Sequence, residues 1–119
     1  MPTIAQWIWT PQVQNFTVPA ATTIGTALRV APIGTLIPKV MFFAEETNTA
    51  PICIGPRNMV MPLGSVPNAT QIELDPGRDY GIWTDDPINE KFDLGFFFAA
   101  HNSAVAQTLY MTIWTVRKL

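Results

Sequence analysis

The sequence predicts an all-β fold: a single β-sandwich of jelly-roll or immunoglobulin-like type, with about eight or nine short antiparallel strands. Proline and glycine recur at short intervals along the chain, so no window is long and periodic enough for a helix. The segments between them are rich in valine, isoleucine, threonine and aromatic residues, which fit a pleated surface. A chain of 119 residues has the size of one domain with a single hydrophobic core.

Each expected strand lies between turn-forming residues. The strands cover residues 4–9, 13–18, 23–30, 36–44, 52–54, 70–74, 79–84, 92–99 and 105–116. We interpret residues 1–18 as an N-terminal arm or as the first strands, and residues 19–119 as the sandwich domain. An arm would reach a neighbouring subunit or a capsid shell, whereas a first strand would pair within the sandwich.

The last expected strand has the clearest alternation, which is the pattern of a strand with two different faces. Leu109, Met111 and Ile113 fall on one face. The opposite face carries Thr108, Tyr110, Thr112, Trp114 and Val116. In residues 92–99 the even positions share a face, which places Phe97 either outward or in a second buried layer.

The sharpest local signal is a turn at Asp75, Pro76 and Gly77. Proline at the second turn position presets φ, and glycine at the third supplies a positive φ, as a type II turn requires. We expect this turn to join residues 71–74 to residues 79–84 as a hairpin with a purely structural role.

The composition disfavours several classes of protein. Charged residues make up only 13% of the chain and apolar residues 48%, which is too apolar for disorder. The seven basic residues are scattered and the net charge is −2, so no nucleic-acid partner is expected. Polar residues interrupt every apolar stretch, so no membrane partner is expected. No leader pattern follows Met1, and synthesis in a host cytoplasm is the simple interpretation.

The side chains that could act in catalysis or bind a metal favour no enzyme, cofactor or metal site. Cys53 is the only cysteine and is expected to be a buried apolar residue. The sole histidine, His101, lies in a turn-like segment without catalytic partners and is expected to be a surface loop residue. Four carboxylates lie close together between residues 85 and 93, but their spacing differs from a calcium-binding loop. A solvated loop is the favoured interpretation, and a metal-assisted hydrolase remains a third, weaker alternative.

The aromatic residues point instead to a docking surface. Trp7 and Trp9 share one face of the first segment, while Tyr110 and Trp114 lie opposite the apolar face of the last strand, so they cannot share one core layer. Aromatic residues are enriched and charges depleted at the core of protein interfaces. The expected oligomer or capsid contacts are Trp7, Trp9, Phe97, Tyr110 and Trp114.

One long segment resembles a pattern in small β-sandwich virion proteins of tailed bacteriophages. The pattern is a strand, an Asn/Thr turn, a strand ending in glycine, a short loop and a hairpin around Pro-Gly. In this chain it comprises Val-Met-Phe-Phe-Ala at residues 40–44, Asn-Thr-Ala-Pro at 48–51, Ile-Cys-Ile-Gly at 52–55, Asn-Met-Val at 58–60 and Ile-Glu-Leu-Asp-Pro-Gly-Arg-Asp-Tyr at 72–80. The resemblance covers less than half of the chain.

The resemblance implies a non-enzymatic role as a capsid decoration (cement), head-fibre or tail component. We therefore expect a phage virion structural protein on the capsid surface. It would self-associate as a homotrimer, contact the major capsid protein and stabilise the head. The alternative is a carbohydrate-binding or receptor-binding β-sandwich module, in which the aromatic residues stack on sugar and Asp85, Asp86 or Asn89 bond its hydroxyl groups.

Overall fold

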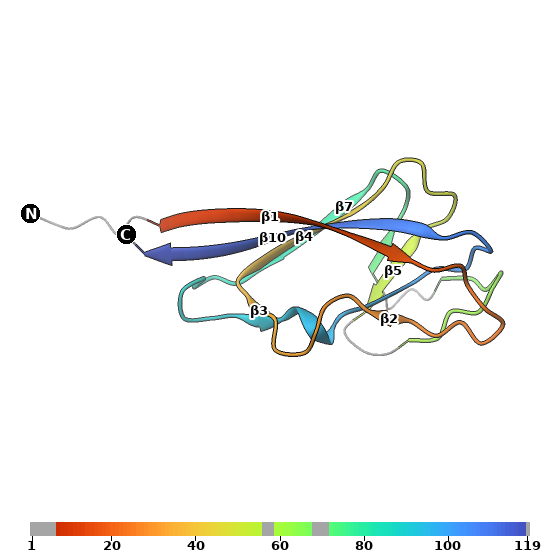
Figure 1. Ribbon diagram of the computed structural model, residues 1–119, viewed down its shortest axis with the longest axis horizontal. Coiled ribbons are helices and arrows are strands. Elements are labelled where there is room, and N and C mark those ends of the chain that lie inside the picture. Colours follow the sequence, from red (N-terminus) through yellow and green to blue (C-terminus); the bar gives the residue numbers. More distant parts are fainter. Residues whose placement is uncertain (1–6, 56–58, 68–71, 119) are drawn as a thin grey trace, which may run out of the picture.

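The computed structural model describes residues 7–55, 59–67 and 72–118, and two four-stranded antiparallel sheets organise them (Figure 1). The first sheet contains, in spatial order, β1 (Trp7–Val18), β10 (Gln107–Lys118), β4 (Lys39–Ala44) and β7 (Asp79–Trp83). The second sheet contains β2 (Leu28–Arg29), β9 (Phe98–Ala100), β5 (Ile52–Gly55) and β6 (Ile72–Leu74). A short pair, β3 (Leu36–Ile37) with β8 (Phe92–Asp93), and a 3₁₀ turn, η1 (Leu94–Phe96), complete the fold.

The strand order is that of a jelly roll. When the short β3–β8 pair is set aside, the first sheet contains the first, eighth, third and sixth strands of the chain, and the second sheet contains the second, seventh, fourth and fifth. This is the double Greek key of an eight-stranded jelly roll. The predicted all-β sandwich is confirmed, in its jelly-roll form.

Within the described residues no helix has the length and apolar character needed to span a membrane.

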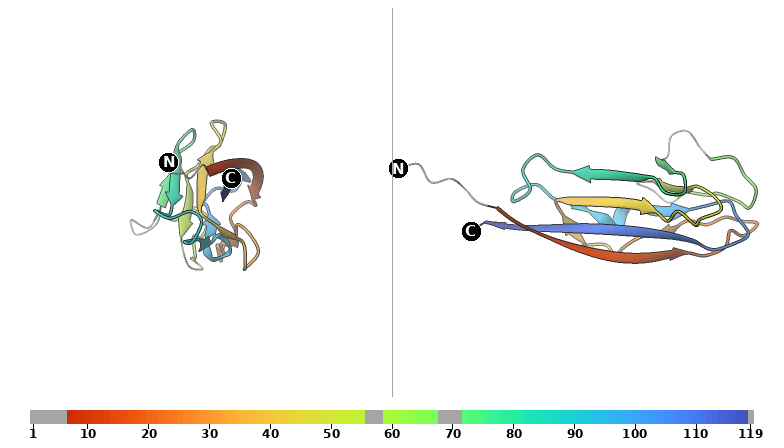
Figure 2. Two further views of the ribbon diagram at one scale, coloured as in Figure 1. Left: turned by 90° about the vertical axis from the view of Figure 1, so that its left-hand side faces the viewer. Right: turned by 90° about the horizontal axis from the view of Figure 1, so that it is seen from above.

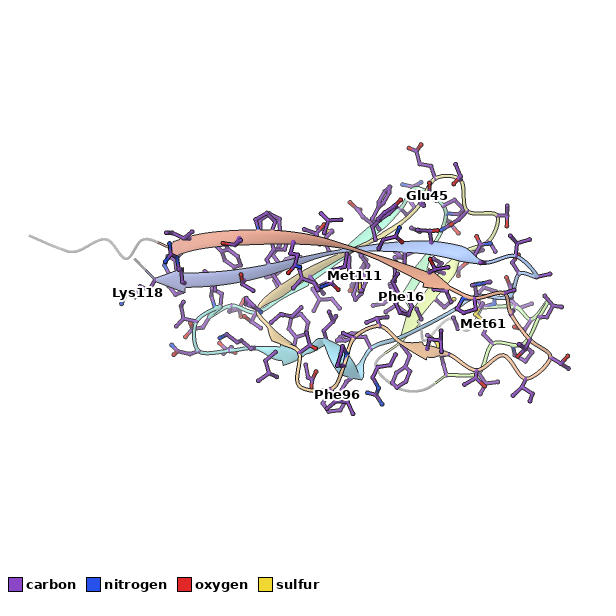
Figure 3. All side chains as sticks on the ribbon, in the orientation of Figure 1. Phe16, Glu45, Met61, Phe96, Met111 and Lys118 are labelled. Carbon is purple, nitrogen blue, oxygen red and sulfur yellow. The ribbon has the colours of Figure 1, made fainter. Side chains whose placement is uncertain are left out.

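The core lies between the two sheets. Leu109, Met111 and Ile113 of β10 face it, and the register pairs Met111 with the fully buried Phe42 of β4. The second sheet contributes Ile54, which is also fully buried. Figure 3 shows Met111 in the space between the sheets. The alternation predicted for the last strand is therefore confirmed.

A single long strand replaces the two strands expected at residues 4–9 and 13–18. The twelve residues of β1 pair with β10 along its whole length, from Trp7 opposite Lys118 to Val18 opposite Gln107. Residues 4–6 lie outside the described part of the chain. Pro11 lies inside β1 because β1 is an edge strand, where a missing N–H costs no ladder hydrogen bond.

Two further expected strands are shorter or divided. Residues 23–30 form only β2 and an isolated bridge between Thr26 and Val60. Residues 36–44 are divided at Pro38 into β3 and β4. The segment that pairs with β8 is thereby separated from the segment that pairs with β10.

The strand expected at residues 92–99 is interrupted by the 3₁₀ turn. The Asp93 carboxylate accepts hydrogen bonds from the backbone N–H groups of Gly95 and Gly34, both at 2.8 Å, and so holds the turn against the β3 loop. The turn shifts the alternation: Phe96 is exposed (Figure 3), whereas Phe97 packs on the core with its ring centroid 6.0 Å from that of Phe42. Of the two positions expected for Phe97, the outward one is therefore wrong, and its role in oligomer or capsid contacts stays a prediction.

The predicted type II turn is present but does not form a hairpin. Gly77 has a φ of 83°, and the Arg78 N–H donates to the Asp75 carbonyl at 2.9 Å. However, β6 pairs with β5 in the second sheet, and β7 pairs with β4 in the first. The turn crosses between the sheets because the backbone groups of Gly77 and Arg78 bond to Ala44 at the end of β4.

The loop between β4 and β5 is fixed to β10 by two buried or half-buried amides. The Gln107 side chain accepts from the N–H groups of Thr49 and Ala50 and donates to the Thr49 hydroxyl and the Val105 carbonyl. Asn48 exchanges a pair of hydrogen bonds with the backbone of Thr108, at 2.8 and 2.9 Å. These bonds satisfy backbone groups where the strand ladder ends.

Candidate binding surface

The side of the first sheet that faces away from the core, here called the outer face, is the main candidate surface. Cross-strand partners place their side chains on the same side, so the register defines its rows. From one end of the sheet to the other, the rows are Trp7–Lys118, Trp9–Val116, Pro11–Trp114–Lys39–Trp83, Val13–Thr112–Met41–Gly81, Asn15–Tyr110–Phe43–Asp79 and Thr17–Thr108. The right-hand view of Figure 2 looks onto this sheet, with β7, β4, β10 and β1 side by side.

The two sheets differ in how their outward sides are covered. A second apolar cluster lies outside the second sheet, where Met59 and Met61 pack against Cys53 and Ala100. The outer face of the first sheet has no such covering segment among the described residues, and its exposed side chains include Val13 at 66% and Trp83 at 63%. The chain therefore supplies a layer for one sheet and leaves the other open.

The charges on the outer face are few, and the principal one is engaged with aromatic rings. The Lys39 Nζ lies 5.0 Å from the ring centroid of Trp114 and 6.0 Å from that of Trp9. These distances are those of cation–π contacts. Trp114 is half-buried, and its indole N–H is buried without an acceptor in the described structure. Of the remaining outer-face side chains in the rows above, only Asp79 and Lys118 are charged.

Two adjacent cavities lie at the end of the first sheet where β1 begins and β10 ends. The first, of about 300 Å³, is lined by Trp9, Lys39, Trp83, Thr84, Asp85 and Pro87. The second, of about 400 Å³, is lined by Trp7, Asp85, Asp86, Pro87, Ile88, Asn89 and Lys118. Asp85 and Pro87 belong to both linings, so together they form the wall between the cavities. We call this pair of cavities the tryptophan end.

The loop that forms this wall is held by its own hydrogen bonds. The Asp86 carboxylate accepts from the side chain of Asn89 at 2.9 Å and from its backbone N–H at 3.3 Å. These bonds lower the pKa of Asp86 below its usual value, because they stabilise the ionised form. The Thr84 hydroxyl donates to the Glu90 carbonyl at 2.9 Å. The Asp86 carboxylate thus serves the conformation of the loop, and no group of three or more metal-ligating side chains converges in the described residues.

The predicted contact residues separate into two locations. Trp7, Trp9, Tyr110 and Trp114 lie on the outer face, and Trp7 also lines the second cavity of the tryptophan end. Phe97 is partly buried and packs against the core, as described above. The turn residues Asp75, Pro76 and Gly77 form the link between the sheets and contribute to neither surface.

Sequence reasoning missed Trp83, which is the most exposed tryptophan of the described chain. The signal was available in part, because Trp83 follows Asp79 and Gly81 on one side of an expected strand. The sequence did not indicate which residues of other strands lie beside Trp83. Only the pairing of β7 with β4 places Trp83 directly opposite Lys39, and thus in one cavity with Trp9.

Two other candidate residues have structural roles. His101 is 2% exposed, accepts the Ser103 N–H at Nδ1 and donates from Nε2 to the Val18 carbonyl, which fixes the end of β1. Its position in the interior corrects the expectation of a surface loop residue. Cys53 is fully buried as predicted, and burial, together with the charge of Glu73, raises the pKa of its thiol to about 11.

Comparisons of the chain with protein-family models, with curated proteins and with solved structures find no match.

Proposed function

We propose that this chain is a non-enzymatic structural protein of a phage virion, a decoration (cement) protein that self-associates as a homotrimer and stabilises the head. The outer face of the first sheet would form the contacts between subunits, and the assembled oligomer would bind the major capsid protein on the capsid surface. The observation that carries the proposal is the contrast between the two sheets: one has its own apolar cover, and the other presents aromatic and aliphatic side chains without one.

The size and chemistry of the outer face support contact with a second copy. Strands of 12, 12, 6 and 5 residues, at about 4.8 Å between strands and about 3.3 Å per residue, cover roughly 550 Å² in projection. The accessible surface is larger because the side chains project, which brings it near the roughly 800 Å² that each partner contributes to a standard interface. Few charges would have to be desolvated, because Lys39, Asp79 and Lys118 are the charged members of the rows.

The architecture is compatible with this role and also with others. Jelly rolls occur in viral capsid proteins and in lectin domains. Fold alone does not decide function, so the proposal depends on the uncovered face and on the resemblance of residues 36–83 to phage virion proteins. The low overall charge, 13% of residues, suits a subunit that functions in a docked state.

The first experiment is the solution mass by light scattering at several protein concentrations. The expected result is the mass of three protomers of 13.2 kDa each. Val13→Lys places a charge on the outer face, halfway along the edge strand β1, and should shift the protein to the mass of one protomer, because an unpaired buried charge opposes association. A monomeric wild-type protein would overturn the proposal.

Val105→Lys is the matched control, because Val105 is 60% exposed, similar to Val13, but precedes β10 at the far end of the sheet. This variant should keep the wild-type mass. A Val13→Lys protein that keeps the oligomer, or a Val105→Lys protein that alone loses it, would show that a different surface associates. Capsid binding is then tested by co-sedimentation with undecorated shells, and failure to sediment would refute the decoration role.

A further inference from the structure

The tryptophan end has features that self-association does not require. Its two cavities combine indole rings, lysine ammonium groups, carboxylates and an amide in a small space. An apolar subunit contact would be expected to exclude such a concentration of polar groups from its centre. We propose that the tryptophan end binds an uncharged oligosaccharide, and that the two cavities hold two consecutive sugar rings.

Aromatic stacking is the first argument. A pyranose ring presents a face of C–H groups, and the face of an indole ring carries the negative side of the aromatic quadrupole. Each cavity has at least one partly exposed indole: Trp9 and Trp83 in the first, at 40% and 63% exposure, and Trp7 in the second, at 39%. Both cavities can therefore offer a ring face to a sugar.

The hydrogen-bonding groups are the second argument. Sugar hydroxyl groups both donate and accept, so a sugar site needs donors and acceptors close to the stacking ring. The first cavity provides the ammonium of Lys39 and the carboxylate of Asp85 beside Trp83. The second provides Lys118 and the Asp86–Asn89 pair, and the hydrogen bonds within that pair fix both side chains before a ligand arrives. Such preorganisation lowers the entropy cost of binding.

The balance of charge indicates an uncharged ligand. Across the two cavities, Lys39 and Lys118 are matched by Asp85 and Asp86, so neither sign dominates. Lys39 is also already engaged with the rings of Trp9 and Trp114. An acidic sugar would meet the carboxylate wall between the cavities, which disfavours it.

The spacing indicates a ligand of at least two sugar units. Trp7 and Trp9 are two residues apart on β1, so both point to the same side with their Cα atoms about 6.6 Å apart. This step is comparable to the length of one sugar unit in a chain. The common wall of Asp85 and Pro87 places the cavities next to each other, as consecutive rings require.

The experiment is a calorimetric titration with uncharged oligosaccharide series, namely cello-, chito-, malto- and manno-oligosaccharides of one to four units. The Val13→Lys protein serves alongside the wild type, so that the outcome is independent of self-association. At least one series should bind, with an affinity that rises from one unit to two and then levels off. Sialylated and uronate-containing oligosaccharides test the charge argument and should bind less tightly.

Variants assign the binding to the two cavities. Trp83→Ala in the first cavity and Trp7→Ala in the second should each weaken binding of the disaccharide about tenfold, the change expected for the loss of one stacking ring. Tyr80→Ala is the matched control, because Tyr80 is an exposed aromatic residue at 45% on the opposite side of β7. Each variant is compared with the wild type by thermal unfolding, and Trp83→Phe should recover part of the affinity.

Several results would overturn the proposal. These are no binding of any uncharged series at millimolar concentration, preference for the acidic sugars, or binding that Trp83→Ala and Trp7→Ala leave unchanged. An affinity that stops rising at one unit would refute the assignment of two rings. These results are judged on the Val13→Lys protein, because subunit contacts through the outer face would cover Trp9 and Trp83 in the wild-type oligomer. Failure here is therefore distinguishable from failure of the structural role.

Discussion

Replacing Gln107 by alanine tests how the start of β10 is held in the fold. The Gln107 side chain is 1% exposed and makes four hydrogen bonds: it accepts from the N–H groups of Thr49 and Ala50, and it donates to the Thr49 hydroxyl and the Val105 carbonyl. Alanine removes all four. The Ala50 N–H is then left without an acceptor in the interior, whereas the Thr49 N–H can be reached by water because Thr49 is exposed.

The expected loss in free energy of unfolding follows from the backbone N–H groups of Thr49 and Ala50. A buried donor without a partner costs about 1–3 kcal/mol, and a lost hydrogen bond near the surface costs about 1 kcal/mol, so the free energy of unfolding should fall by about 3 kcal/mol. For a chain of this length, about 4 °C per kcal/mol corresponds to a decrease of about 12 °C in the melting temperature. Thermal unfolding followed by circular dichroism measures this change.

The control is Gln14→Ala, because Gln14 is an exposed residue of edge strand β1. That variant should remain within about 0.5 kcal/mol of the wild type. If Gln107→Ala lowers the melting temperature by less than about 4 °C, the loop between β4 and β5 is satisfied in another way, and the reasoning from its hydrogen bonds is refuted.

Two further predictions concern the interior and the turns. The Cys53 thiol keeps its proton up to a pH of about 11 in the folded chain but ionises near pH 9 when unfolded, so stability is constant below pH 9 and falls by on the order of 2 kcal/mol by pH 11. Urea unfolding against pH, with Cys53→Ala as the reference, should show this component only in the wild type, and an equal pH dependence of both proteins would contradict it. Gly25 has a φ of 68°, and a Cβ there would lie 2.2 Å from the Met61 carbonyl carbon, so Gly25→Ala should cost more than about 3 kcal/mol. Gly34, with a φ of 95° and open space around it, should lose only about 1 kcal/mol on the same change, and equal losses in thermal unfolding would refute the role of the contact.

Several features of this protein could be predicted from the sequence because they depend on neighbouring residues only. Alternation along residues 107–113 determines which side of β10 enters the core, since successive side chains of a strand point to opposite faces. The Pro76-Gly77 pair determines a turn, because it supplies the two φ values that the turn needs. The apolar residues around Cys53 predict its burial. The all-β class follows from many such local signals that agree.

The tertiary structure decided how these pieces are paired. The turn at Gly77 crosses between the sheets because its backbone bonds to Ala44, a residue far away in the chain. The alternation of side chains expected over residues 92–99 is interrupted because Asp93 caps a 3₁₀ turn and accepts a hydrogen bond from Gly34. Both outcomes depend on partners from other parts of the chain, and no local pattern specifies those partners.

For the candidate surfaces too, the sequence predicts some features and the tertiary structure decides the others. The sequence indicated that its aromatic residues exceed the needs of one core and that Trp9, Tyr110 and Trp114 would lie outside it. Only the pairing of β1, β10, β4 and β7 joins them in one face and brings Trp83 beside Lys39, and only the packing of the two sheets places Phe97 against the core. The physical reason is that side-chain direction is a local property of a strand, whereas the neighbours of a strand are selected by the burial of the whole sheet.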